Sequence, residues 1–283
     1  MLLLPLIDPA IERALSEDLA GGDLSAEACV APEQAATANA LVKSPTVVCG
    51  GAVFCRVFER LDADVRFQAL VPDGTLAPKG TLIWRVEGRA RSLLMGERTA
   101  LNFVQRMSGT ATLARRAVDA LPAGSKTRIA DTRKTTPGLR YFERYAVRTG
   151  GAHNHRDQLG SAVMIKDNHI VAAGGIGVAI ERARARAPHT SRVEVEVTNM
   201  TELDEAIGAQ ADIIMLDNFD DAATARAVEH ARKREPRIII ESSGNITVER
   251  IRTLAEIGVD VISIGALTHS APAADISLDF VLA

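Results

Sequence analysis

The spacing of apolar residues in the first part of the chain predicts a mixture of helices and strands. Residues 8–18 and 51–61 carry apolar side chains at the spacing of an amphipathic helix, and residues 20–25 form a predicted turn. Valine-rich or alternating stretches predict strands within residues 35–50, 64–71 and 81–87. Together these elements predict a small α+β domain.

A longer helical pattern covers residues 89–121. Its first half places Glu97 and Arg98 among regularly spaced leucines, which an ordinary polar helix face would also explain. The Ser-Gly-Thr sequence within residues 107–110 predicts an interruption of this helix.

After Lys126, short apolar runs alternate with helical stretches. The runs are residues 128–131, 162–167, 193–197, 212–218, 238–244 and 260–266. The clearest helices are residues 138–149, 175–187, 200–209, 221–234 and 247–257. This alternation predicts parallel strands joined by helices, and the strands are too few for a closed eightfold barrel. The pattern therefore favours an open, incomplete α/β barrel; a doubly wound sheet is the alternative, but no G-x-G-x-x-G sequence supports it.

Polar residues lie within or directly after these apolar runs. They are Asp131-Thr132-Arg133-Lys134, Lys166-Asp167-Asn168, Glu194 and Glu196, Asp217-Asn218, Glu241-Ser242-Ser243-Gly244, and Gly265. In α/β barrels the loops after the strands all open on one side, where active sites lie. The repeated pattern predicts an active site on that side of the sheet.

The stretch between Arg128 and Lys166 concentrates positive charge. It holds eight basic and three acidic residues, about +5 in a chain whose formal net charge is −3. Such a cationic region predicts a site for a small, multiply charged anion, because nucleic-acid binding more often calls for a basic face and a high pI. A solvated arginine-rich helix is the alternative for Arg140, Arg144 and Arg148, which recur at helical spacing.

Composition and cysteine spacing indicate a globular protein of the cytoplasm. Hydrophobic residues make up 47% of the chain, enough for a sizeable core. Cys29, Cys49 and Cys55 lack the spacing of a redox pair or zinc site, so we expect reduced, mostly buried thiols. The N-terminal apolar run, broken by Pro5, is too short for a membrane span and lacks the basic flank of a signal peptide. We expect no binding to membranes or nucleic acid.

Small residues after the last two runs predict a phosphate site. Residues 243–245 and 265–266 would let backbone N–H groups approach an anion, and barrels often bind phosphate after their final two strands. Each turn alone is also explained as a tight connection between strand and helix. His269, shortly downstream, could contact the phosphate or cap a turn.

Carboxylates on neighbouring strands predict a magnesium site. Glu196 and Asp217 could share Mg²⁺, which prefers carboxylates and the phosphate oxygens of substrates. A structural ion pair with a nearby cation is the alternative. Glu194 is expected on the same side of its strand as Glu196.

His153 and His155 stand two residues apart, a spacing that invites a metal interpretation. No further His or Cys stands at a fitting distance, so we expect no dedicated zinc site. His155 followed by Arg156 is better explained as a pair of donors to a carboxylate. No nucleophile elbow is present to support a Ser–His–Asp mechanism.

Several motifs carry a resemblance to one enzyme family. They are DTRKTTPGLR, GGAHNHR, IKDNH, EVEV, MLDN, ESSGNI and ISIGALTHSAPAADISL. With them the chain, from about Glu17 to its C-terminus, resembles the quinolinate phosphoribosyltransferases, and residues 128–169 are the most specific part. The resemblance implies an N-terminal α/β sandwich domain (1–112), an incomplete α/β barrel (113–270) and a tail (271–283) that returns to the first domain.

The resemblance also implies a reaction. The phosphoribosyl group of phosphoribosyl pyrophosphate (PRPP) is transferred to quinolinate in the presence of Mg²⁺, giving nicotinate mononucleotide, pyrophosphate and CO₂. Both substrates are polyanions, which would account for the cationic stretch. The family implies a homodimer with shared active sites, because Arg98 would reach the site of a partner subunit, and a larger oligomer is left open.

Residue roles follow from the matching positions. By resemblance, Lys134 would neutralise pyrophosphate, Glu196 and Asp217 would bind the magnesium-bound PRPP, and Lys134, Lys166, Glu196 and Asp217 would be the catalytic groups. The dicarboxylate would be bound by Arg98, Arg133, His155, Arg156 and Lys166, and Thr132 would also contact substrate. The 5′-phosphate would be bound by Ser243, Gly244, Asn245, Gly265, Ala266 and His269.

Two other functions compete with this interpretation. A related family encoded with molybdate transporters shares TRKT and the His-Arg pair but lacks the lysine of IKDNH, and Lys166 is present here. A non-catalytic phosphate-ligand sensor would not need Lys134, Glu196 and Asp217. Two departures from the family pattern, Ala152 in place of a further glycine and the DQLGSAV turn, touch no expected ligand.

Overall fold

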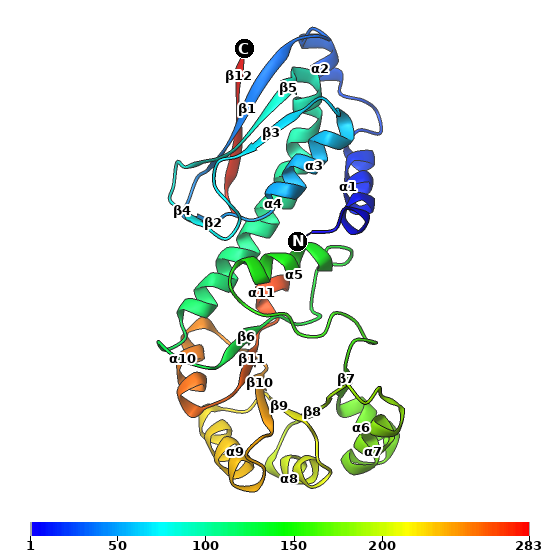
Figure 1. The fold of residues 1–283 in the computed structure, drawn as a ribbon, viewed down its shortest axis with the longest axis vertical. Helices are drawn as coiled ribbons and strands as arrows, with labels where there is room; N and C mark the ends of the chain where they lie inside the picture. Colours follow the sequence, from blue (N-terminus) through cyan, green and yellow to red (C-terminus); the bar gives the residue numbers. More distant parts are fainter. Residues whose placement is uncertain (1, 283) are drawn as a thin grey trace. The chain divides into compact units, whose positions relative to one another are not determined.

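A computed structural model describes residues 2–282 of the chain. Residue 1 of the expected first domain and residue 283 of the expected tail lie outside the described residues. The chain forms two compact units (Figure 1). Unit 1 comprises the chain up to Arg115, Lys134–Gly151 and the chain from Ala266 onward; unit 2 comprises Arg116–Arg133 and Ala152–Gly265. The expected boundaries at residues 112 and 270 stay predictions, and contacts group residues 134–151 with the first part of the chain.

Unit 1 contains a four-stranded antiparallel sheet in the order β12-β1-β5-β3. Its strands are β1 (Ala35–Val42), β3 (Arg66–Ala69), β5 (Leu82–Arg89) and β12 (Ile276–Leu282), and β2 (Thr46–Val47) and β4 (Leu76–Ala77) form a separate pair. Strand β12, in the C-terminal tail, pairs with β1 from Ala36–Leu282 to Val42–Ile276. The first and last strands of the chain therefore share one sheet.

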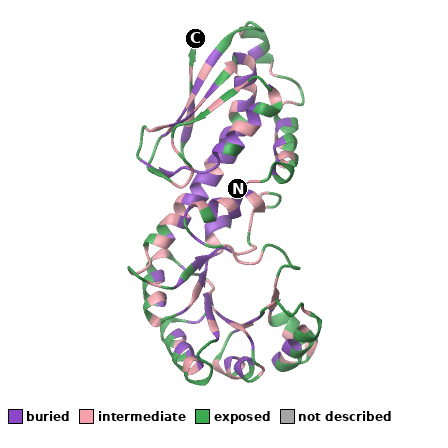
Figure 2. Ribbon diagram, in the orientation of Figure 1, coloured by how far each residue is buried: buried purple, intermediate pink, exposed green. Residues whose placement is uncertain are grey.

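Unit 1 also contains the helices α1 (Leu4–Asp18), α2 (Leu24–Cys29), α3 (Gly51–Leu61), α5 (Arg140–Thr149), α11 (Ala266–His269) and the first part of α4 (Ala90–Asp119). Apolar residues of α1, α3, α4 and α5 form one core with the strands β1, β5 and β12. Buried residues gather on their inner sides (Figure 2). In the core the rings of Phe54 and Phe58 meet edge to face at 5.0 Å between centroids, and Trp84 lies at the same distance from Phe54. Such aromatic contacts add to the stabilisation from buried area.

Helix α4 is continuous, and the expected interruption at residues 107–110 was wrong. The Ser108 hydroxyl bonds to the backbone N–H and C=O of Cys49, both at 3.1 Å, instead of competing for its own helix. A Cβ on Gly109 would lie 1.9 Å from the carbonyl oxygen of Pro272. The small residues serve close packing of the helix against other segments.

Two short helices begin where the sequence predicted turns or strand ends. Helix α2 starts directly after Asp23, whose side chain accepts a hydrogen bond of 2.9 Å from the N–H of Ala26. Helix α6 (Asp167–Ala173) follows the IKD sequence, with Lys166 at its N-cap. Short helices of this kind depend on caps more than on apolar periodicity, which explains why the pattern missed them.

The arginine-rich helix α5 is not simply a solvated face. Glu143 and Arg144 are 2% and 6% exposed. Glu143 accepts hydrogen bonds from Arg106 at 2.9 Å and from the hydroxyl of Thr136 at 2.7 Å. A buried carboxylate needs such partners, so part of the charge on this helix belongs to the interior of unit 1.

Unit 2 is built on a parallel sheet in the order β6-β11-β10-β9-β8-β7. Its strands are β6 (Arg128–Ala130), β7 (Val163–Ile165), β8 (Val193–Val197), β9 (Ile213–Asp217), β10 (Ile239–Ser243) and β11 (Val261–Ser263). The connecting helices include α6, α7 (Ile176–Arg186), α8 (Met200–Gly208), α9 (Asp221–Arg234) and α10 (Val248–Ile257). Because β6 and β7 stand at opposite ends of this order, the barrel is open, and the expected incomplete α/β barrel is confirmed.

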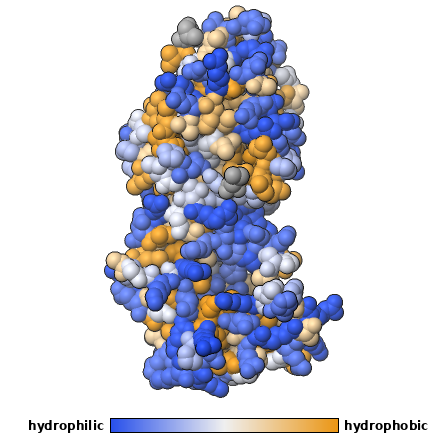
Figure 3. Space-filling view, in the orientation of Figure 1, coloured by the Kyte–Doolittle hydropathy of each residue, from blue (hydrophilic) through white to orange (hydrophobic). Residues whose placement is uncertain are grey.

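The helices of unit 2 are amphipathic. In α9 the buried positions are Thr224, Ala227, Val228 and Ala231, at helical spacing. The outer surfaces of α8 and α9, at the bottom of Figure 3, are mostly hydrophilic. No helix within residues 2–282 combines the length and the apolar composition that crossing a membrane requires. The cysteines are free thiols; Cys49 is buried as expected, whereas Cys29 is exposed.

Candidate active site

The register of the parallel sheet places the polar strand residues of unit 2 on one side. Glu196 pairs with Met215, and Asp217 pairs with Ser243, two residues farther along. Side chains alternate along a strand, and paired residues of neighbouring strands point to the same side. The side that carries Glu196 therefore also carries Lys166, Glu194, Asp217, Glu241, Ser243 and Ser263.

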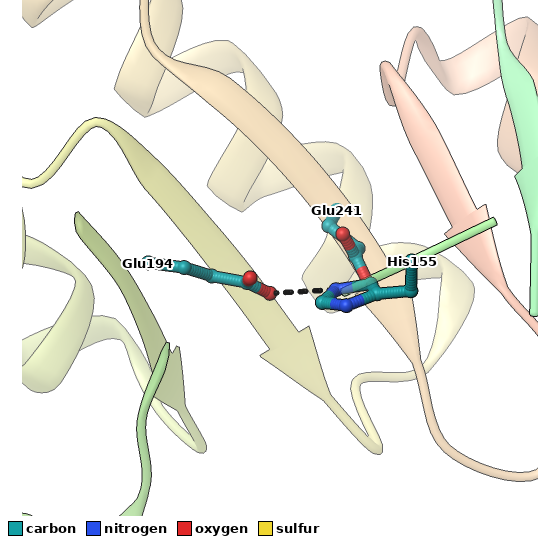
Figure 4. A group of neighbouring side chains, drawn as sticks. All are labelled: His155, Glu194 and Glu241. Atoms are coloured by element: carbon teal, nitrogen blue, oxygen red, sulfur yellow. Dashed lines mark hydrogen bonds and ion pairs between the residues drawn. The ribbon is translucent and has the colours of Figure 1, made fainter. Parts of the chain in front are cut away.

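At the centre of this side, His155 lies between two buried glutamates (Figure 4). Its Nε2 is 3.3 Å from Oε1 of Glu194 on β8 and 3.5 Å from Oε1 of Glu241 on β10. Each of the two glutamates is 3% exposed. Their shared partner is an imidazole nitrogen that can donate a hydrogen bond to either.

Electrostatics and hydrogen bonding agree on a proton at Nε2 of His155. Burial alone would lower the pKa of His155, but hydrogen bonds and charge from Glu194 and Glu241 raise it to about 10. The raised pKa favours a second proton on Nδ1, whereas the backbone N–H of Arg156 donates to Nδ1 at 2.8 Å. This hydrogen bond shows that Nδ1 carries no proton, because two N–H groups cannot point at each other at this distance. Burial raises the pKa of Glu194, so a carboxylate of the cluster can take the extra proton.

The same protonation argues against a metal ion in this cluster. The ligand atoms of His155, Glu194 and Glu241 lie within 4.8 Å of one another. A histidine that binds a metal through Nε2 donates a proton from Nδ1 to an acceptor. Here Nδ1 faces a donor, so Nε2 acts as a hydrogen-bond donor and is not available as a ligand.

Two guanidinium groups lie close together beside this cluster. The pKa of Arg156 is lowered by burial and by the positive charge of Arg133, while Glu194 acts in the opposite direction. The Nε of Arg133 is buried and has no hydrogen-bond partner among residues 2–282. Neighbouring like charges and an unsatisfied buried donor are both relieved by an anion, and planar guanidinium groups suit carboxylates.

Lys166 and Glu196 form an ion pair on the same side of the sheet. Lys166 is the N-cap residue of α6, and its backbone N–H donates to Nδ1 of His169 at 2.9 Å. Asp217, on the next strand, accepts a hydrogen bond of 2.8 Å from the amide of Asn218. Glu196 and Asp217, the carboxylates expected to bind Mg²⁺, thus lie on neighbouring strands and on the same face of the sheet. Glu196 also forms an ion pair with a cation, Lys166, which was the alternative explanation for it.

The loop expected to bind phosphate is closely packed against the loop after β9. Gly244 has φ 92°, and a Cβ there would meet Oδ1 of Asn218 at 2.3 Å. The amide of Asn245 donates to the same Oδ1 at 3.2 Å. Glycine is required at position 244 by this approach and by its backbone conformation. Helix α10 begins at Val248, slightly later than expected.

Known proteins place the chain in a family. A model of the quinolinate phosphoribosyl transferase C-terminal domain matches residues 110–279, and a model of the N-terminal domain matches residues 23–108. The chain belongs to the quinolinate phosphoribosyl transferase family.

Relatives of the transferase family match almost the whole chain. A probable carboxylating nicotinate-nucleotide pyrophosphorylase of Synechocystis sp. is 42% identical over 276 residues, which is 98% of this chain and 93% of the relative. The human carboxylating nicotinate-nucleotide pyrophosphorylase is 40% identical, with the same coverage of both chains. The structure of the nicotinate-nucleotide pyrophosphorylase from Francisella tularensis has a TM-score of 0.93 and 40% identity, covering 99% of this chain and 98% of that chain.

The residues that the family resemblance assigned to substrates are divided between the two units. Unit 2 contains Thr132, Arg133, His155, Arg156, Lys166, Glu196, Asp217, Ser243, Gly244, Asn245 and Gly265. Unit 1 contains Arg98, Lys134, Ala266 and His269. Within unit 1 the carbonyl oxygen of Lys134 accepts a hydrogen bond of 2.8 Å from the Thr268 hydroxyl. Arg98, on α4, lines a cavity of about 310 Å³ whose walls also come from α1 and α5.

Sequence reasoning assigned no role to two residues that position the transferase site. Asp131, fully buried after β6, accepts hydrogen bonds from the Asn154 amide at 2.6 Å and the His155 N–H at 2.7 Å. Asn218 fixes the Gly244 turn, with φ 57° itself. The sequence does show that each is a polar residue close after an apolar run. Their partners, however, lie more than twenty residues away, and the pattern of apolar and polar positions does not reveal them.

Proposed function

We propose that this chain transfers the phosphoribosyl group of PRPP to quinolinate and releases CO₂, yielding nicotinate mononucleotide and pyrophosphate. The observation that carries the proposal is the identity of 40–42% to carboxylating nicotinate-nucleotide pyrophosphorylases over 98% of the chain. The cationic and acidic groups on one side of the unit 2 sheet support it. Neither the molybdate-transport-associated function nor a sensor function appears among these relatives.

The dicarboxylate half of the site is assigned to basic residues of unit 2. Arg133 and Arg156 would bind carboxylate oxygens through paired N–H groups, with Lys166 as a further cation. Thr132 and His155 would add polar contacts. The buried Nε of Arg133 and the mutual repulsion of the two guanidinium groups support an anion at this position.

The PRPP half is assigned to the carboxylates Glu196 and Asp217 and to Lys134. Two carboxylates on one face of neighbouring strands fit Mg²⁺, which binds through one or two carboxylates plus phosphate oxygens. When bound, Mg²⁺ would offset negative charge on the pyrophosphate group of PRPP. Lys134 would neutralise the departing pyrophosphate. Glu196 must exchange its partner Lys166 for this role.

The ribose 5′-phosphate is assigned to the loops after the last two strands. Backbone N–H groups of small residues there would donate to phosphate oxygens. The approach of Gly244 to Asn218 supports a fixed shape for this loop before ligand binds. The assigned residues are Ser243, Gly244, Asn245, Gly265, Ala266 and His269.

The reaction needs no nucleophilic side chain. The pyridine nitrogen of quinolinate attacks C1 of the ribose as the C1–O bond to pyrophosphate breaks. Fixed charges hold the two reactants in line and stabilise the leaving group. The positive charge of the resulting pyridinium ring then stabilises the electron pair left on the ring carbon when CO₂ departs, and a proton from solvent adds to that carbon to complete nicotinate mononucleotide.

The working unit is proposed to be a homodimer with shared active sites. The family resemblance assigns Arg98, on α4 of unit 1, to the dicarboxylate site of a partner subunit. A larger oligomer stays open, and a cytoplasmic location stays a prediction.

The proposal is tested with quinolinate labelled in the carboxyl group that is lost. Wild-type protein with PRPP and Mg²⁺ is expected to release labelled CO₂, and omission of PRPP is expected to stop the release. Arg133→Ala should weaken quinolinate binding, whereas Asp217→Asn should weaken PRPP binding. Binding of both substrates by folded protein without CO₂ release would favour the sensor alternative and contradict the proposal.

A further inference from the structure

Two buried carboxylates in unit 2 have no substrate assigned to them. Glu194 and Glu241 are each 3% exposed, whereas the half-buried Glu196 and Asp217 are assigned to PRPP. Burying two like charges is unfavourable unless a partner compensates them. Since apolar residues would stabilise such a core equally well, stability alone gives no reason for this pair.

The partner that the glutamates share is His155. The segment that carries it runs beside the edge strand β6, with a bridge between Ala130 and His153. From there the His155 side chain reaches Glu194 on β8 and Glu241 on β10, strands that are separated by β9 (Figure 4). Oε1 of Glu241 is buried and faces the same nitrogen at 3.5 Å. Nε2 of His155 is thus hydrogen-bonded to Glu194 and lies next to the charge of Glu241 on the other side.

The other edge of the ring is connected to the arginine that the dicarboxylate requires. The backbone N–H of Arg156 donates to Nδ1 of His155 at 2.8 Å, and Nη1 of Arg156 donates to the carbonyl of Ala162 at 3.0 Å. The His155 N–H donates to Asp131 at 2.7 Å. If the ring rotates, the backbone at Arg156 loses an acceptor.

We propose that Glu194 and Glu241 are positioning residues: by sharing the Nε2 proton of His155 they fix its ring and, through Nδ1, the backbone of Arg156 for binding a dicarboxylate. This inference rests on the proposed function for the identity of the dicarboxylate. Neither glutamate touches the substrate in this account. In metal sites, carboxylates that do not touch the metal orient the histidines that bind it. Here the two glutamates would orient a histidine beside an anion site in the same way.

Glu194→Gln and Glu241→Gln test the proposal, because glutamine keeps the side-chain shape and removes the charge. Glu229→Gln is the matched control, since Glu229 is an exposed residue that pairs with Lys233 on its own helix. We expect the Kd and KM for quinolinate to rise about tenfold in each test variant, while the KM for PRPP changes less than about twofold. The control should match wild type in both.

A spectroscopic measurement separates orientation from general damage. Nitrogen NMR of His155, assigned with a His155→Gln variant, is expected to show a proton on Nε2 in wild type. In the Glu194→Gln, Glu241→Gln double variant the proton should redistribute between the two ring nitrogens. Circular dichroism and Tm establish that each variant folds.

Two results would overturn the proposal. One is an unchanged His155 spectrum in the double variant; the other is equal weakening of quinolinate and PRPP binding, as general damage would produce. The NMR measurement needs no substrate. If wild-type protein forms no nicotinate mononucleotide, the proposed function fails, and the spectrum still decides whether the glutamates fix the ring.

Discussion

Arg133 and Arg156 show how a charge pattern becomes a site only when the fold brings its members together. In the sequence they are two of eight basic residues between Arg128 and Lys166. In unit 2 they lie close enough for Arg133 to lower the pKa of Arg156, and Arg144, equally basic, is buried in unit 1 instead. Proximity in space therefore selects the anion-binding residues from a larger set.

Arg133→Lys tests the role of the planar guanidinium group. Lysine keeps the charge but cannot offer paired N–H groups to a carboxylate. We expect the Kd for quinolinate, measured by calorimetry, to rise about tenfold, with PRPP binding nearly unchanged. Arg148→Lys on the exposed side of α5 is the matched control. Equal quinolinate affinity in wild type and Arg133→Lys would remove Arg133 from the carboxylate site.

At this scale the sequence identified residue types better than residue partners. The TRKT and HNHR motifs pointed to Arg133, His155 and Arg156. The glutamates that surround His155 come from β8 and β10, so no spacing along the chain relates them to it. Asp131 was recognised only as a polar residue after an apolar run, because its partners are backbone and amide groups twenty-three and twenty-four residues away.

Among the elements, α4 shows that a glycine within a helix can serve packing. An Ala at position 109 would raise helix propensity by about 1 kcal/mol. Its Cβ would nevertheless meet backbone atoms of Pro272 and Ala274, which cannot move as a flexible side chain does. We expect Gly109→Ala to lower the free energy of unfolding by about 1–3 kcal/mol in urea denaturation.

Gly177→Ala is the control for this substitution. Gly177 lies in α7, and a Cβ at this position would have no heavy atom of another residue within 4 Å, its chain neighbours and its own helix backbone aside. It should be neutral or slightly stabilising. If Gly109→Ala were as stable as Gly177→Ala, the close approach of the tail to α4 would be wrong.

Asp62 joins three elements of unit 1 at the end of α3. Arg89 holds the pKa of this carboxyl well below its ordinary value of 3.8; burial opposes the shift, and the N–H of Asp64 and the hydroxyl of Ser92 reinforce it. A depressed pKa means that the stabilisation is complete above pH 3.8 and disappears as the pH falls through the folded-state pKa.

Asp62→Asn is therefore expected to lower the free energy of unfolding by about 1–3 kcal/mol at pH 7. The difference from wild type should shrink as the pH is lowered below 3.8, in denaturant titrations at several pH values. Asp64→Asn, at an exposed position two residues away, is the control and should show little difference at any pH. A difference that grows towards acid pH would contradict the sign of this argument.

The elements of unit 2 were the more predictable part of the fold. Each of its strands lies within an apolar run identified in the sequence, because strands buried on both faces carry nearly continuous apolar residues. The predicted interruption of α4 was wrong, because tertiary packing at Ser108 and Gly109 overrides the low helix propensity of these residues. The α2 and α6 helices were missed because caps, rather than periodicity, define them.

For the whole molecule, the central structural proposal is an active site shared between subunits. Arg98→Ala and Lys166→Ala protein should each be nearly inactive alone. After subunit exchange, mixed dimers would contain one site with both residues intact, so activity should return to at most about a quarter of the wild-type value. An exchange measured by native mass spectrometry without any return of activity would contradict a site shared through Arg98.

The most direct test of the account is one complete reaction. Purified protein is incubated with quinolinate, PRPP and Mg²⁺, and the products are quantified by phosphorus NMR, mass spectrometry and CO₂ capture. The account predicts nicotinate mononucleotide, pyrophosphate and CO₂ in equal amounts, and none of them with the folded Lys166→Ala protein. Wild-type protein that binds both substrates and forms no nicotinate mononucleotide would contradict it.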